Sequence, residues 1–156
     1  MKTLKQRGII KKNIKNMLFQ SENIKSLLIG ECHDKKTIDL FNQKVKSHLF
    51  IDDTLTDKET LIFFDVVCPR LTQHIKECRI ILYGICHRDL LDVSLPINDY
   101  FGNRADVLAN LIEECLLDKS NAKQFGIGEL SLDSVDIYNS TNYYGVQMIF
   151  SVNDFR

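Results

Sequence analysis

Two Cys-His pairs are the residues in this sequence whose types and spacing could bind a metal ion. Cys32 and His33 lie in GECHD, and Cys86 and His87 lie in GICHRD. A Cys2His2 zinc site usually has two to four residues between the ligands of each pair, and here they are adjacent. Cys86 and His87 also end a predicted strand, where successive side chains point to opposite faces. We therefore expect Cys86 to face the core and His87 to face solvent or a neighbouring molecule, and we expect no metal.

The sequence gives still weaker support for a catalytic site or a nucleotide-binding site. No glycine turn or signature sequence marks any of the five cysteines as a nucleophile paired with a histidine base. The GxG at Gly126 and Gly128 lacks the third glycine of a dinucleotide motif and precedes a predicted strand rather than a helix. Carboxylates cluster in a predicted loop (Asp52, Asp53 and Asp57) and on a predicted helix (Glu113 and Glu114). Neither carboxylate set suggests an acid and base pair, so we expect no enzyme and no cofactor.

Composition predicts an ordinary protein of one compact domain with a peripheral arm. The chain has 156 residues, 44% of them hydrophobic and 26% charged, with a net charge of −1. Its apolar runs are far shorter than the ~20 residues that cross a bilayer, so we expect no membrane association, and no export signal is recognisable at the N-terminus. The odd number of cysteines and the lack of a CxxC pair favour reduced thiols in a cytosolic setting.

Positive charge is concentrated before the first acidic residue, Glu22. This basic segment contains Lys2, Lys5, Arg7, Lys11, Lys12 and Lys15. One interpretation is a solvated helix face with a frayed terminus. The other is an arm that contacts phosphate or an acidic protein neighbour.

The first third of the chain is predicted to be helical. Apolar residues recur at three- and four-residue steps over residues 13–29, with a break near Ser21 and a stop at Gly30. Asp34 is expected to cap a second helix whose apolar face is formed by Ile38, Phe41, Val45 and Leu49. An acidic, Thr-rich connector over residues 49–60 follows. We therefore divide the chain into a helical N-terminal extension or arm, residues 1–57, and an α+β ring-forming domain, residues 58–156.

The remainder is predicted to contain two hairpins separated by a helix. Strands over residues 61–68 and 76–87 form the first hairpin, with Pro69 ending the first strand and a loop at 69–74. After an irregular connection at 92–102, Asn103 caps a helix over residues 104–117. Two further strands flank a turn at 139–142, and the last strand alternates apolar and polar residues from Tyr144 to Val152. This order predicts an α+β fold: an antiparallel sheet of two hairpins with helices on one face.

Two arginines are candidates for contact with a neighbouring subunit, because arginine is enriched at protein interfaces. Arg70 lies in the predicted hairpin loop, and Arg104 lies in the first turn of a helix, where a cation is unfavourable for the helix dipole. The alternative for Arg104 is an ion pair with Asp99 or Asp106 of the same chain.

The same region resembles tail-completion and head-to-tail connector (neck) proteins of tailed bacteriophages. The resemblance extends over residues 60–155, in the element order of hairpin, helix and hairpin and in a last strand with Tyr-Gly before alternating apolar residues. It is carried by CPRLT, RIILYGICH, YFGNRADVLANLIEECL and FGIGELSLDSVDIYNSTNYYGVQMIFSV.

The resemblance implies a structural virion protein without an active site, found in the neck of the virion and in the host cytoplasm during assembly. Such a subunit forms a six- or twelvefold ring, as a tail-completion, terminator or connector protein between the portal and the tail tube protein, and packaged DNA is a further contact. Its implied contact segments are residues 69–74, 92–102 and 153–156, which add His74, Tyr100 and Arg156 to the candidates. The helical first third of this chain is a departure from the short completion proteins, which do not need it. The resemblance therefore does not indicate which of the neck rings this protein forms. The alternative hypothesis is an intracellular metal-binding or thiol-dependent protein that uses the Cys-His pairs.

Overall fold

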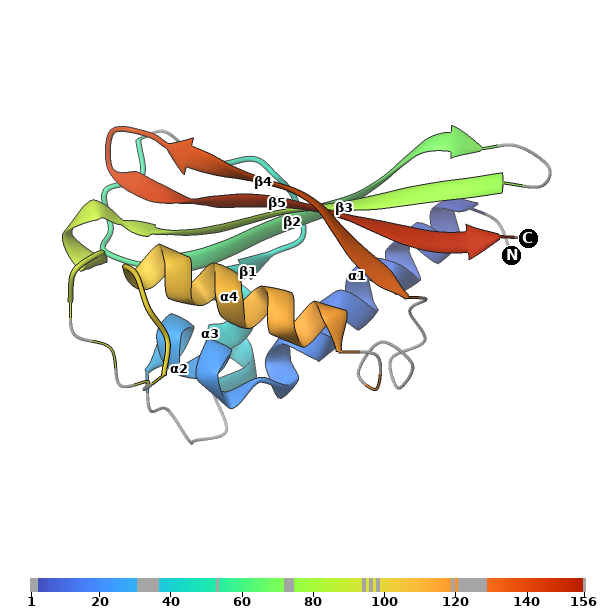
Figure 1. Cartoon of the computed structure of the whole chain (residues 1–156). Coiled ribbons are helices and arrows are strands. Elements are labelled where there is room, and N and C mark those ends of the chain that lie inside the picture. The colour runs from blue at the N-terminus through green and yellow to red at the C-terminus, as the bar shows by residue number, and fades with distance from the viewer. Residues whose placement is uncertain are drawn as a thin grey trace.

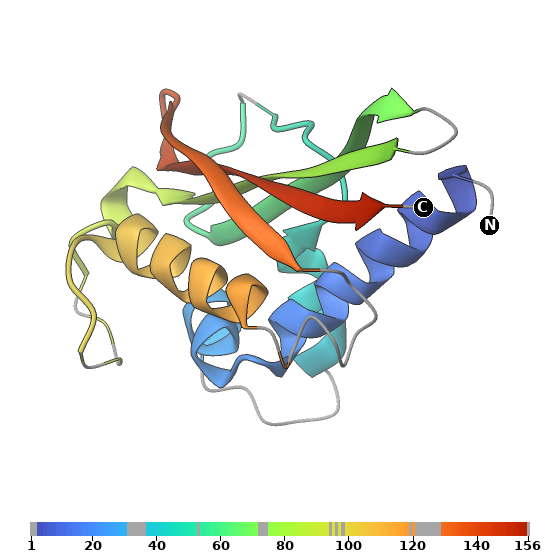
Figure 2. The same ribbon diagram turned by 45° about the vertical axis from the view of Figure 1, so that its right-hand side comes forward.

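A layer of helices covers one face of a five-stranded sheet (Figure 1). The computed structural model describes residues 3–30, 37–52, 54–71, 75–93, 95, 97, 99–118, 120 and 129–155. Figure 2 shows α1 and α4 beneath opposite halves of the sheet. The predicted α+β fold of two hairpins with helices on one face is confirmed.

Within the described residues the strands lie side by side in the order β1, β2, β3, β5, β4. The pairs β2 with β3, β3 with β5, and β4 with β5 are antiparallel, whereas β1 runs parallel to β2. The elements are α1 (Thr3–Gln20), α2 (Glu22–Ile29), α3 (Thr37–Lys44), β1 (Val45–Lys46), β2 (Thr60–Leu71), β3 (Ile75–His87), the 3-10 turn η1 (Arg88–Leu90), α4 (Arg104–Leu117), β4 (Leu130–Asn139) and β5 (Tyr143–Phe155).

Local capping signals are confirmed where the sequence predicts them. Ser21 separates α1 from α2 and accepts a hydrogen bond at its hydroxyl from the Ile24 amide. Gly30 ends α2 with a φ of 71°, a left-handed value that glycine adopts without steric cost. Asn103 and Asp106 form a capping box at the start of α4.

The predicted helix boundaries in the first third need two corrections. α1 begins at Thr3 rather than at residue 13. The apolar periodicity in the sequence starts late because the first turns make polar rather than apolar contacts with the sheet. Val45 and Leu49 are not helical: α3 ends at Lys44, and Val45 pairs with Ile62 in the sheet. The predicted cap Asp34 lies outside the described residues.

Pro69 does not end β2, which continues to Leu71. The pairing of β2 with β3 shifts between Val67 and Arg70, so Pro69 lies at an irregularity where the ladder is already interrupted. Proline is tolerated in a sheet at such bulges and on edge strands.

The helices and the sheet share one hydrophobic core. Ile14, Met17 and Leu18 of α1 belong to the same buried cluster as Phe64 and Leu82 of the sheet. Residues 1–57, predicted as an extension or arm, thus contribute buried side chains to the core of residues 58–156. No helix in the described parts of the chain is long and apolar enough to cross a membrane.

A second, smaller cluster lies on the opposite face of the sheet. Leu61, Phe63, Ile85 and Tyr143 form it, and Leu49, Ile51 and Leu55 of the connector pack against it. The hydroxyl of Tyr143 donates a hydrogen bond to the Asp57 carbonyl. The connector therefore covers part of the face that the helices leave open.

Candidate interaction surfaces

Cys86 and His87 lie on opposite faces of β3. Cys86 is fully buried, and burial raises the pKa of its thiol to about 11. His87 is 8% exposed and its ring packs edge-on against Tyr143 at 5.6 Å between centroids, so the prediction that it faces solvent or a neighbour was wrong. Cys32 and His33 lie outside the described residues. Among the residues described, no three His, Cys, Asp or Glu side chains gather as metal ligands.

Arg104 makes its contacts inside the protomer. Its Nε donates to Thr60 Oγ1 at 2.7 Å, and its Nη2 donates to the Leu27 carbonyl at 2.6 Å. Burial lowers the pKa of this guanidinium. Arg104 therefore connects the start of α4 to β2 and α2. These intrachain contacts, rather than the alternative ion pair with Asp99 or Asp106 or the candidate contact with a neighbouring subunit, explain a cation at a helix start.

The other candidate contact residues have different placements. The Tyr100 hydroxyl donates to Glu114 Oε2 at 2.8 Å. Arg70 lies in β2 opposite Glu77, and its side chain is not described. His74 and Arg156 lie outside the described residues. Close to Tyr100, the connection over residues 92–102 exposes two large apolar side chains, Val93 at 49% and Phe101 at 89%.

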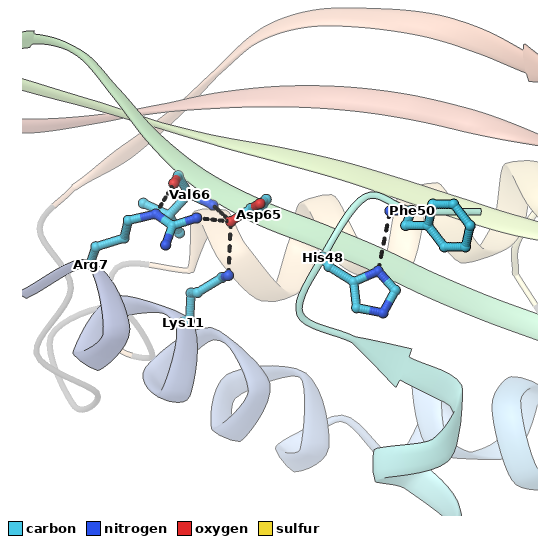
Figure 3. Close-up of polar contacts among 6 residues, drawn as sticks. All are labelled: Arg7, Lys11, His48, Phe50, Asp65 and Val66. Carbon is cyan, nitrogen blue, oxygen red and sulfur yellow. Dashed lines mark hydrogen bonds and ion pairs between the residues drawn. The ribbon is translucent and has the colours of Figure 1, made fainter. Parts of the chain in front are cut away.

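The residues of the basic segment lie in different environments. Arg7 and Lys11 point toward β2, where both contact the same oxygen, Asp65 Oδ1, at 2.5 and 2.9 Å (Figure 3). Arg7 Nε also donates to the Val66 carbonyl at 2.5 Å. These bonds attach the start of α1 to the sheet, so Arg7 and Lys11 are structural contacts rather than part of a free arm.

The remaining bases of this segment differ in exposure. Lys5 and Lys12 are exposed. Lys15 is partly buried, and its pKa is lowered by that burial and by the charge of Lys46. Lys2 lies outside the described residues. Lys5 and Lys12 are therefore the described bases of α1 that are best placed for an external partner.

The contacts of Asp65 predict that the folded protein loses a measurable amount of stability at low pH. Partial burial alone would raise the pKa of this carboxyl. The hydrogen bonds from Lys11 and from the Val66 amide, with the charges of Lys11 and Arg7, outweigh burial and lower the pKa. A carboxyl with a lowered folded-state pKa stabilises the fold above its unfolded pKa of about 4, and this contribution is lost as the pH falls through the folded value.

We expect Asp65→Asn to reduce the free energy of unfolding by about 1 kcal/mol at pH 7, because the ion pairs are partly exposed. The difference from wild type should shrink as the pH falls through the lowered folded-state pKa, because the wild-type carboxyl then also becomes neutral. Urea unfolding in a series from pH 7 into the acid range measures it, with the exposed Asp39→Asn as control. A difference that does not change with pH would contradict this assignment.

The outward side of α1 presents lysines together with exposed apolar side chains. Leu4 is 80% exposed and Ile9 is 37% exposed. Lys5, Gly8 and Lys12 lie between and beside them, at three- and four-residue spacing, and are exposed. We call Leu4, Lys5, Gly8, Ile9 and Lys12 the α1 surface.

The outermost strand at the other edge of the sheet presents aspartates with exposed apolar side chains. Val135 is 62% exposed and Ile137 is 64% exposed. Val135 and Ile137 point to one face of the strand and the exposed Asp136 points to the other, so these side chains lie on both sides of the strand edge. Asp133 is exposed at the register shift between Leu132 and Ser134, where its carboxylate accepts hydrogen bonds from Ser131 and Ser151. Within the described residues β4 pairs only with β5, so its outer edge is open. We call Asp133, Val135, Asp136 and Ile137 the β4 surface.

The two surfaces are complementary and lie at opposite sides of the protomer. α1 contacts the sheet at β2, whereas β4 is the strand farthest from β1 and β2 (Figures 1 and 2). Each surface extends ~12 Å, from the rise per residue of a helix and of a strand. One surface carries two lysines, the other two aspartates, and each has two exposed apolar side chains. The sequence shows these residue types but not their gathering on two opposite edges.

Comparison with known proteins identifies the family of the chain. No curated protein matches the sequence. The YomW family model matches residues 10–152, from the first buried residue of α1 to the last strand, β5. The match includes the helical first third as well as the two hairpins. This chain therefore belongs to the YomW family, a family of phage-type proteins.

Proposed function

We propose that this protein is a structural virion protein, a subunit of a homo-oligomeric ring at the head-to-tail neck of a tailed bacteriophage. The observation that carries the proposal is the pair of complementary surfaces on opposite edges of the protomer. Membership of a phage-type family and the order of hairpin, helix and hairpin support the neck as the location.

Head-to-tail contact between unlike surfaces is the geometry that forms rings. When the β4 surface of one copy binds the α1 surface of the next, every copy uses both surfaces, and the series closes if the rotation allows. Aspartates then meet lysines, which favours this pairing over contact between two like surfaces. Val135 and Ile137 would lose their exposure to water against Leu4 and Ile9, which favours association.

The neighbouring rings would bind away from these two edges. α4 begins at one end of the molecule, and the exposed Phe101 shortly precedes it in the chain. β3 begins at the other end, where Ile75 pairs with Phe155 at the end of β5 (Figure 1). We assign these ends to the portal or connector protein and to the tail tube protein. Lysine side chains of the ring subunit would make its contacts with packaged DNA. The role requires no catalysis and no cofactor, and it places the protein in the host cytoplasm during assembly and in the virion neck afterwards.

Native mass spectrometry of the purified chain tests the ring directly. At micromolar and higher concentrations we expect a metal-free species of six or twelve copies of the 18.1 kDa chain. The same sample is then mixed with its cognate portal and tail tube proteins. A chain that stays monomeric both alone and with these proteins would contradict the proposal, and stoichiometric zinc would favour the Cys-His alternative.

A further inference from the structure

Cys68 and Cys78 lie opposite each other on neighbouring strands. β2 pairs with β3 up to Val67 and Arg79, and the pairing resumes at Arg70 and Glu77. Cys68 and Pro69 are therefore the two residues of β2 that face the single residue Cys78. In this structure both cysteines are thiols, and their Sγ atoms are 2.8 Å apart.

This arrangement places the two sulfurs close enough to form a disulfide. An S–S bond is about 2.05 Å long, so the Sγ atoms, now 2.8 Å apart, need to approach by about 0.8 Å. Both side chains already point toward each other, as the contact between the sulfurs requires. Cys86 and Cys115 are also thiols, and they are buried on β3 and α4.

We propose that Cys68 and Cys78 are an oxidation site that forms an intramolecular disulfide across the β2–β3 hairpin. Cys68 is partly exposed and Cys78 is 2% exposed, so Cys68 is the thiol that an external oxidant reaches. With a small disulfide such as oxidised glutathione, the Cys68 thiolate attacks one sulfur and releases one molecule of glutathione. The Cys78 thiolate then attacks Cys68 Sγ in the mixed disulfide and releases the second. Two protein thiols are oxidised and one glutathione disulfide is reduced to two thiols.

The bond would fix the hairpin at the point where its ladder is irregular. Pro69 contributes no amide hydrogen there, and the register shift interrupts the pairing. A covalent link across this position restricts the unfolded chain and stabilises the hairpin that ends beside the C-terminal strand. For a virion protein, which is the function proposed above, the thiols would stay reduced in the host cytoplasm and oxidise after release. This timing rests on that proposal, whereas the disulfide itself does not.

The test is oxidation of the folded full-length chain with glutathione disulfide, followed by acid quenching, alkylation of free thiols and peptide mapping. We expect wild type to lose two of its five thiols and to yield one linked pair of peptides containing Cys68 and Cys78. The thermal midpoint of the oxidised protein should rise by about 5 °C or more and return after treatment with dithiothreitol.

Matched variants separate this pair from the other cysteines. Cys86→Ser should lose the same two thiols as wild type, whereas Cys68→Ser and Cys68→Ala should form no intramolecular disulfide. Position 68 is chosen because it is partly exposed, so the variants retain the fold. Five free thiols in oxidised wild type, or a linked pair that involves another cysteine, would overturn the proposal. Neither result depends on whether the protein forms a ring.

Discussion

A Gly145→Ala variant is expected to lose about 3 kcal/mol of its free energy of unfolding, the upper part of the usual range for overpacking. Gly145 lies in β5 between its partners Ile85 of β3 and Tyr138 of β4. A Cβ atom there would come within 2.6 Å of Ile85 Cα and within 2.2 Å of the Gly84 carbonyl oxygen. These are backbone atoms of the neighbouring strand, so they cannot move aside without separating β3 from β5.

Thermal and urea unfolding measure this loss, which corresponds to a fall of about 6–12 °C in the thermal midpoint for a chain of this size. Gly8→Ala is the control. A Cβ at Gly8 meets nothing within 4 Å, and alanine favours a helix interior over glycine by about 1 kcal/mol. The control should therefore be at least as stable as wild type. A Gly145→Ala protein as stable as wild type would show that β3 and β5 are not packed as described.

Features determined by local sequence were predictable. The break at Ser21, the stop at Gly30 and the capping box of Asn103 with Asp106 depend on residues within one helical turn of each other. The alternation along β5 likewise reflects one buried face, since Val146, Met148, Phe150 and Val152 are all buried.

Features determined by distant partners were not predictable. α1 begins at Thr3 because Arg7 and Lys11 reach Asp65, more than fifty positions away, and no apolar period marks this contact. β1 has only two residues and exists because Ile62 and Phe63 lie beside it. Pro69 was expected to end its strand, and only the register shift against β3 explains why it does not.

The candidate surfaces also depend on distant contacts that the sequence alone does not reveal. The basic segment and the aspartates near Val135 are visible in the sequence. The sequence does not show which basic residues contact the sheet and which are exposed. Arg7 and Lys11 differ from Lys5 and Lys12 only in their contact with Asp65, which is distant in the sequence. His87 was expected at the surface, yet its ring packs against Tyr143. The irregular connector, which has no apolar period in the sequence, packs against the cluster that contains Tyr143.

Changing either edge surface is expected to abolish assembly of the ring. In a β4 variant, Asp136→Lys with Ile137→Thr reverses one charge and removes one exposed apolar side chain, while threonine keeps the preference for a strand. In an α1 variant, Lys5→Glu with Lys12→Glu reverses both lysines. Like charges then face each other across the contact, which costs several kcal/mol. We expect each variant to be monomeric by native mass spectrometry at concentrations where wild type forms a ring.

A matched control distinguishes loss of the contact from a general effect of charge. Ile38 and Asp39 of α3 are an exposed apolar and acidic pair outside both surfaces. Ile38→Thr with Asp39→Lys makes the same chemical changes as the β4 variant and should leave the ring intact. A control that loses the ring as completely as the β4 variant would remove the case for the β4 surface. All three variants change exposed side chains, so their unfolding midpoints should stay close to wild type.

The central claim is that unlike surfaces of neighbouring copies bind head to tail, and mixing the two monomeric variants tests it most directly. The β4 variant retains an intact α1 surface, and the α1 variant retains an intact β4 surface, so a mixture contains the partners for the original contact. The lysine introduced at position 136 and the glutamates introduced at positions 5 and 12 are also opposite in charge, so the two altered surfaces no longer meet a like charge. Native mass spectrometry of an equimolar mixture is predicted to show complexes that contain both variants. Two variants that remain monomeric when mixed, or one that still assembles alone, would contradict head-to-tail binding through these surfaces.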